Sequence, residues 1–261
     1  MEAGQVRQRT TLLLAAVLAL NLIFWMGAKF IYAKWEGVPP VPERNGAVMM
    51  ALGDPQFAYR LGALTLQNLG DSGGRVTPIR SYSYPRLGAW FHLLDELDPA
   101  SDHVPMLAAY YFGGTRVPAD VAVIVDYLSH VGVRPVGSKW RWLVQAVFLA
   151  RHRLGDLQLA LDLAYKLSKM ELLDDAMPAW ARQMPAFILK EKGDREDARK
   201  IMAELLATGK GLHPNEISFM KAYLTEQLGV PPDEVDRLVR ARGDAGNNGE
   251  YRRPLPAPEP Q

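Results

Sequence analysis

Two stretches of the chain repeat one pattern, and this repetition limits the folds that the chain can form. Residues 153–167 (RLGDLQLALDLAYKL) and 191–205 (EKGDREDARKIMAEL) each contain a Gly-Asp pair, and the two pairs lie 38 residues apart. In both stretches an alanine follows five residues after the glycine, and further apolar residues follow at helical spacing. Glycine permits a tight turn, and a small alanine lets one helix approach its neighbour closely. The repeat therefore predicts helices joined by short turns and stacked in series.

An amphipathic segment precedes each of these turns, at residues 139–152 and 177–192. No alternation of apolar and polar residues competes with the helical patterns between residues 47 and 242. The sequence therefore predicts an all-α domain over residues 47–242.

These units of helix, Gly-Asp turn and helix resemble those of the tetratricopeptide-repeat family. The resemblance extends upstream to 57–71, with another Gly-Asp turn, to 86–99, which ends on Leu-Asp-Pro, and to 101–132, with Ala108 and Ala109 at the close-approach positions. It implies a helical hairpin array of about four units within 47–210, followed by terminal helices at 214–229 and 231–242. In this family the first helices of the units line a concave face that binds protein segments.

The chain begins with an apolar stretch that predicts a membrane anchor. Residues 10–28 are 19 uncharged residues. A helix rises about 1.5 Å per residue, so this stretch spans a hydrocarbon core of about 30 Å. With the aromatic residues that follow, we place the anchor at residues 10–35, after a tail at 1–9. A cleaved signal peptide is the alternative, although no small-x-small cleavage site follows the stretch.

Basic residues flank the span on both sides. Arg7, Arg9 and the amino terminus precede it, and Lys29 and Lys34 follow it. The small excess before the span favours a cytoplasmic amino terminus and a single-pass topology. In a bacterium this would place the anchor in the inner membrane and the helical domain in the periplasm.

Proline-rich segments flank the helical domain. Residues 36–46 (EGVPPVPERNG) predict an extended linker. Residues 243–261 contain few apolar residues and much Gly, Asn and Pro, which predicts a disordered tail.

The sequence Gly-Asp-Ser-Gly-Gly at residues 70–74 matches the surroundings of the nucleophilic serine in chymotrypsin-like proteases. In that family the catalytic histidine precedes the serine, whereas all five histidines of this chain follow Ser72. We therefore interpret the segment as a turn after the first repeat helix, and a serine hydrolase using Ser72 is an alternative function.

The turn continues into an insertion, residues 72–85, that the later units lack. Long insertions in repeat proteins lie on one face and often carry binding residues. Arginine beside tyrosine suits an acidic or aromatic partner surface. The candidate contacts are Arg75, Arg80, Tyr82 and Tyr84, and the alternative is a loop whose tyrosines pack back onto the array.

Aromatic residues on or near the presumed first helices are the other candidate contacts, because the resemblance places them on the concave face. They are Tyr110, Tyr111, Trp140, Trp142 and Trp180. Aromatic residues at helical spacing are also typical of a core.

No catalytic, metal or cofactor site is predicted. The cluster of His92, Asp95 and Glu96 supplies too few ligands from a single helical turn, and no nucleotide-binding fingerprint occurs. A net charge of +1 gives no reason to expect nucleic acid. The sequence predicts a membrane-anchored scaffold or assembly factor that binds proteins, and the expected partners are other membrane proteins. A helical array that binds a small molecule or lipid is a further alternative.

Overall fold

Helices make up nearly all of the described chain, as the sequence predicts. The computed structural model describes residues 2–28, 37–72, 75–170, 177–208 and 212–246. The α-helices are α1 (Glu2–Ala28), α2 (Arg44–Met50), α3 (Pro55–Gln67), α4 (Tyr84–Leu97), α5 (His103–Met106), α6 (Pro118–Gly132), α7 (Trp140–Leu149), α8 (Leu157–Ser168), α9 (Ala179–Lys192), α10 (Arg195–Thr208), α11 (Pro214–Ala222) and α12 (Pro232–Gly246). Short 3-10 segments are η1 (Ile79–Ser81) and η3 (Phe112–Gly114), and π-helical turns are η2 (Leu107–Tyr111), η4 (Ala150–Leu154) and η5 (Tyr223–Gln227).

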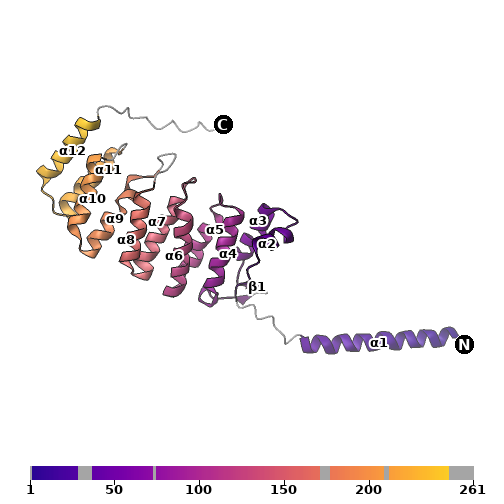
Figure 1. The fold of residues 1–261 in the computed structure, drawn as a ribbon. Coiled ribbons are helices and arrows are strands. Elements are labelled where there is room, and N and C mark those ends of the chain that lie inside the picture. Colours follow the sequence, from indigo (N-terminus) through magenta and orange to yellow (C-terminus); the bar gives the residue numbers. More distant parts are fainter. Residues whose placement is uncertain (1, 29–36, 73–74, 171–176, 209–211, 247–261) are drawn as a thin grey trace, which may run out of the picture.

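The helices after α1 pack in the order in which they occur in the chain. Figure 1 shows them side by side, from α2 and α3 at one end of the array to α12 at the other. Helix α6 packs against α7, α7 against α8, α8 against α9, and α9 against α10. Helices α6 to α10 therefore bury their apolar faces against one another, and the core runs along the array.

The two Gly-Asp turns have the conformation that the repeat predicts. Gly155 and Gly193 end their helices in the left-handed region, at φ 67° and 94°, which glycine adopts without a steric cost. The Asp156 side chain then accepts a hydrogen bond from the backbone N–H of Leu159 at 2.9 Å and caps α8. One dipeptide thus ends one helix and begins the next.

Helix α1 is long and apolar enough to cross a membrane. Its candidate span, Arg9–Ala28, has a mean hydropathy of 2.1, and none of that window is buried. A signal sequence shares these properties. The helix begins before the predicted span, at Glu2. Residues 29–36, which hold the end of the predicted anchor and the first residue of the predicted linker, lie outside the described residues.

The predicted linker differs in the structure, because its described part packs on the array. Val38 is buried, and its carbonyl oxygen accepts a hydrogen bond from Arg86 at 3.4 Å. The indole N–H of Trp90 donates to the carbonyl oxygen of Pro39 at 3.0 Å. The prolines keep the backbone extended, and helix α2 already begins at Arg44. The part of the predicted linker that the structure describes is therefore docked on the array.

The insertion after α3 also packs inward. It begins with a two-residue antiparallel pair, β1 (Asp71–Ser72) with β2 (Arg75–Val76), which the sequence analysis did not predict. Tyr82 and Tyr84 are both buried. The Tyr82 hydroxyl donates to the carbonyl oxygen of Leu69, and the Tyr84 hydroxyl to that of Phe112, each at 2.9 Å. Burial raises the pKa of both phenols to about 12.

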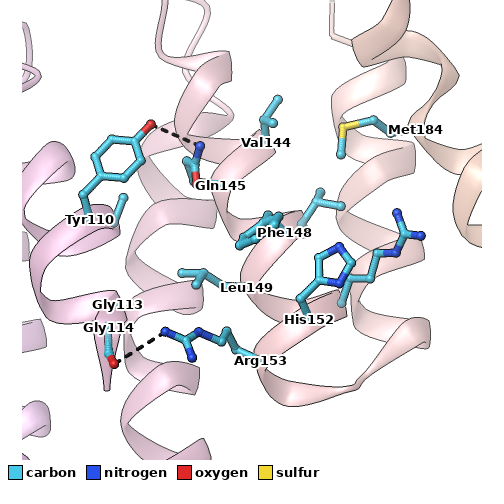
Figure 2. A pocket seen from close by; sticks show the side chains of 13 residues that line it. Tyr110, Gly113, Gly114, Val144, Gln145, Phe148, Leu149, His152, Arg153 and Met184 are labelled. Atoms are coloured by element: carbon cyan, nitrogen blue, oxygen red, sulfur yellow. Dashed lines mark hydrogen bonds between the residues drawn. The ribbon is translucent and has the colours of Figure 1, made fainter. Parts of the chain in front are cut away.

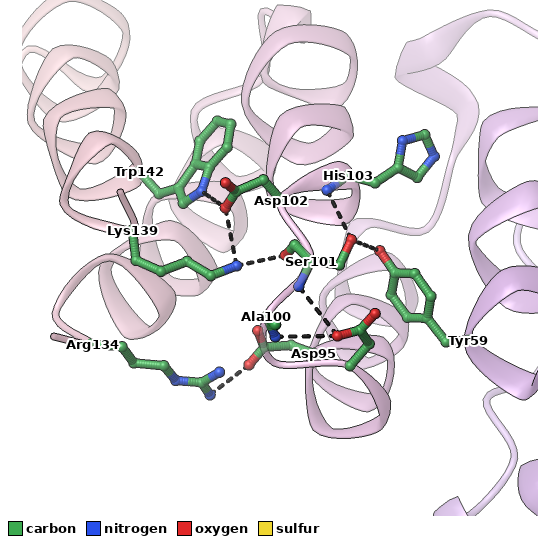
Figure 3. Close-up of polar contacts among 10 residues, drawn as sticks. Tyr59, Asp95, Ala100, Ser101, Asp102, His103, Arg134, Lys139 and Trp142 are labelled. Atoms are coloured by element: carbon green, nitrogen blue, oxygen red, sulfur yellow. Dashed lines mark hydrogen bonds and ion pairs between the residues drawn. The ribbon is translucent and has the colours of Figure 1, made fainter. Parts of the chain in front are cut away.

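A polar network ties α3 to α7 through the turn between α4 and α5 (Figure 3). Tyr59 of α3 donates to the hydroxyl oxygen of Ser101 at 2.6 Å. The buried ammonium of Lys139 lies 2.5 Å from the carbonyl oxygen of Ser101 and 3.0 Å from Asp102 Oδ1. The indole N–H of Trp142 donates to that same Oδ1 at 2.7 Å. A single carboxylate oxygen therefore serves two buried donors at the start of α7, Trp142 and the N-cap residue Lys139.

Half-buried His92 of α4 faces the exposed His130 of α6. The rings of His92 and His130 lie 5.2 Å apart. Burial, and next the neighbouring His130, lower the pKa of the His92 imidazole from its ordinary value of 6.5. The carboxylates of Asp126, Asp95 and Glu96 act in the opposite direction with less effect.

The pKa of His92 predicts a loss of stability in acid. The unfolded chain keeps the ordinary pKa, so just below pH 6.5 it binds more protons than the folded protein does. The contribution of His92 to the free energy of unfolding is therefore complete above that pH. It decreases as the pH drops towards the lower pKa that His92 has in the folded protein. We expect His92→Gln to weaken this fall in urea denaturation measured from neutral pH to about 5. His103→Gln is the control, and equal pH profiles for both variants and the parent would contradict the prediction.

Candidate partner-binding groove

Two hollows follow one another along the array and share Arg151. The first has a volume of about 430 Å³ and lies between η2, η3, α7, η4 and α9. The second has a volume of about 680 Å³ and lies between η4, α9, α11 and η5. We call the two hollows together the groove. Its walls are helices that precede the turns into α6, α8, α10 and α12. The sequence assigns the first three of these positions to first helices and the last, at 214–229, to a terminal helix.

Local departures from α-helical geometry shape these walls. Helices α5, α7 and α11 each continue into a π-helical turn, η2, η4 and η5, and each of these turns contributes to a hollow. A π turn holds one more residue than an α turn, so it shifts the side chains that follow it around the helix. In α9 a proline, Pro185, lies inside the helix instead. Such turns recur at functional sites.

The first hollow is open and largely apolar (Figure 2). Phe148 is 50% exposed, and its ring lies 4.7 Å from that of His152. Tyr110 is 64% exposed, and its hydroxyl accepts a hydrogen bond from Gln145 at 3.1 Å. Met184 lies across the hollow on α9. Large apolar surface is thus left uncovered next to free space.

The second hollow has an aromatic wall. The ring centroid of Phe187 lies 6.1 Å from that of Phe219 and 5.1 Å from that of Tyr223. The Lys190 ammonium lies 5.6 Å from the centroid of the Tyr223 ring and 2.5 Å from Gln227 Oε1. Burial raises the pKa of the Tyr223 hydroxyl. This wall combines rings in edge-to-face contact with a cation beside them.

Cations outnumber carboxylates among the residues that line the groove. The lining residues include Arg151, Arg153 and Lys190, with Glu191 as the one carboxylate among them. Arg151 forms an ion pair with that glutamate. Arg153 is exposed and lies 3.5 Å from the carbonyl oxygen of Gly114, at the limit of a hydrogen bond. The groove therefore offers positive charge beside apolar rings.

The predicted aromatic contacts differ in burial and do not share one surface in the structure. Tyr110 lines the groove, whereas Tyr111 is exposed beside it, with its ring 4.9 Å from that of Phe112. Trp140 and Trp142 are buried core residues of α7. Trp180 is 45% exposed and packs on Trp140 at 6.0 Å between ring centroids.

The predicted contacts of the insertion do not form a shared surface in the described structure. Arg80 is exposed in η1, and the side chain of Arg75 lies outside the described residues. Tyr82 and Tyr84 are in the core, so the expectation that they face a partner is corrected. Their hydroxyls find acceptors within the array, and the rings add to its apolar contacts.

The sequence predicts only a small part of the groove. Its candidate contacts do not include Phe148, Phe187 or Arg151, although the spacing of the two phenylalanines before the Gly-Asp turns is a signal in the sequence. Phe148 lies seven residues before the glycine of its turn, and Phe187 lies six before the corresponding glycine. The π turn η4 accounts for the extra residue, so the two rings occupy comparable places in the groove.

Comparison with known proteins finds no family model, no curated relative and no solved structure that matches this chain. The groove itself is therefore the basis for a function.

Proposed function

We propose that this protein is a membrane-anchored scaffold whose groove binds a segment of a partner protein. Its helices would form tetratricopeptide-like hairpins, with the walls of the groove as their first helices. The observation that supports the proposal best is the half-exposed ring of Phe148, which borders an open hollow with cations beside it. Exposed apolar surface that is concave and rimmed by polar groups is typical of interaction sites.

The groove favours a partner segment of defined chemistry. An apolar or aromatic side chain would fill the first hollow against Phe148 and Met184. A carboxylate on the same segment would pair with Arg153 or Lys190, which lie at the exposed margin of the groove. Burial of the ring would supply affinity, and the charges would orient the segment and speed association.

Helix α1 adds the second part of the proposal. An anchor confines the groove to a layer next to the bilayer, which raises its effective concentration for other membrane proteins. Weak contacts with a short segment then suffice for assembly. Partners would therefore be membrane proteins that present an acidic and apolar segment near the surface.

We expect the double variant Phe148→Ala with Arg153→Glu to lose its partner. Truncating a central contact residue typically costs about 2 kcal/mol, so capture should fall by about tenfold or more. The measurement is chemical crosslinking of the full-length protein in its native membrane, with quantitative mass spectrometry of what is captured. Phe148 is half exposed and Arg153 is exposed. Neither substitution should therefore disturb the core, and the helical circular dichroism spectrum should not change.

Val136→Ala is the matched control, since this side chain is also half exposed but does not line the groove. Partners that persist in the groove variant and disappear when Arg75 and Arg80 are replaced would assign binding to the insertion. The absence of any specific partner would count against the scaffold and would direct attention to ligands and to the hydrolase alternative at Ser72.

A further inference from the structure

The two ends of the array differ in chemistry. At the far end, the exposed residues of α12 include the charged side chains of Asp233, Glu234 and Arg237. At the near end, Met49, Met50 and Leu52 are 78%, 79% and 91% exposed. Terminal units of a helical array need a polar outer face to remain soluble. The α12 end meets this requirement, and the α2–α3 end does not.

More apolar surface lies on the same end. Along α3, Phe57, Leu61 and Leu64 are between 43% and 56% exposed and follow helical spacing. Leu52, in the turn between α2 and α3, has a φ of 56°, which leucine rarely adopts. Leucine at a protruding turn, in a conformation that favours glycine, does little for folding. The side chain is therefore more readily explained by something that covers it.

The connection to α1 indicates what covers this end. Helix α1 ends at Ala28, and the chain is docked on the array again from Val38. The connection between Ala28 and Gly37 spans at most about 30 Å even when fully extended. If α1 spans a bilayer, the α2–α3 end cannot move far from that bilayer.

We propose that the α2–α3 end of the array rests on the bilayer that holds α1, with Met49, Met50 and Leu52 inserted at its interface. The inference rests on the anchoring role of α1 in the proposed function. A narrow turn of flexible apolar side chains suits a fluid surface better than it suits a rigid, complementary protein interface. The groove would then be held at a fixed orientation to the membrane.

Charge contributes little to this contact. The exposed residues Arg44 and Arg60 are balanced by Glu43 and Asp54, and the carboxylate of Asp54 caps α3 by accepting from the backbone N–H of Gln56 at 2.8 Å. We therefore expect the contact to form on vesicles of zwitterionic phosphatidylcholine, without a requirement for anionic lipid.

The absence of cysteine from the sequence permits a direct test. The full-length protein is reconstituted in phosphatidylcholine vesicles with a single environment-sensitive fluorophore at Leu52→Cys. Leu18→Cys in α1 reports the anchor, and Val136→Cys reports an exposed turn elsewhere. We expect a blue-shifted emission and quenching by nitroxide-labelled lipid at residues 52 and 18, and neither at 136.

The other outcomes overturn the inference in distinguishable ways. Quenching at residue 18 with a water-exposed signal at 52 would leave the anchor intact and remove the contact. A blue shift at 52 without quenching by lipid would mean that protein, a second copy or a partner, covers this end. If lipid does not quench the label at 18, α1 does not lie in the bilayer, and both the proposed anchor and the proposed contact are contradicted.

Discussion

Replacing Gly132 by alanine is expected to lower the free energy of unfolding by about 3 kcal/mol or more, because the added methyl group collides with backbone. A Cβ at this position would lie 2.3 Å from the backbone nitrogen of Leu143 and 2.7 Å from its Cα. Both residues are buried where α6 meets α7. A flexible side chain could move aside, whereas these backbone atoms belong to a helix. The two helices would have to separate.

Gly46→Ala is the control for this prediction, since it makes the same chemical change within α2, where no atom lies within 4 Å of the new Cβ. Alanine favours a helix over glycine by about 1 kcal/mol, so this variant should be slightly more stable than the parent. Urea denaturation followed by circular dichroism measures both. Equal stability of the two variants would show that α6 and α7 are not packed as closely as described.

The same substitution connects stability to the groove. Helix α7 carries Phe148 on one side and contacts α6 on the other. A displacement of α7 would therefore change the width of the first hollow. We expect Gly132→Ala to reduce partner capture even though the residue lies outside the groove.

Local signals made part of this fold predictable. A Gly-Asp pair contains the information for its own turn, because glycine supplies the left-handed conformation and aspartate caps the next helix. Apolar residues at helical spacing likewise predict the helices on either side. The all-helical fold and the apolar helix α1 could therefore be inferred from short stretches of sequence.

The remaining features depend on contacts between distant residues. Tyr82 and Tyr84 can be buried because their hydroxyls donate hydrogen bonds to the carbonyl oxygens of Leu69 and Phe112. The sequence of the insertion does not indicate where those acceptors lie. The groove was missed for a related reason. The π turn η4 adds a residue between Phe148 and the Gly-Asp turn, so a regular helical period counted back from that turn places Phe148 incorrectly.

The network at Asp102 is the clearest case of such a distant contact, and it carries the second large prediction. Asp102→Ala is expected to lower the free energy of unfolding by about 2–4 kcal/mol, because it leaves the buried ammonium of Lys139 without its counter-charge. It also removes the acceptor of the Trp142 indole N–H. Asp102 itself is half exposed, which places the expected loss below that of a fully buried pair.

A double-mutant cycle separates this pairing from a general effect of the turn. Asp102→Ala combined with Lys139→Met removes the buried ammonium as well as its counter-charge, so the loss should be smaller than in Asp102→Ala alone. Urea denaturation gives the four stabilities. If the two losses simply add, the carboxylate does not stabilise the ammonium. If the coupling is present, one carboxylate holds α7 in place, and α7 is the helix that presents Phe148 to the groove.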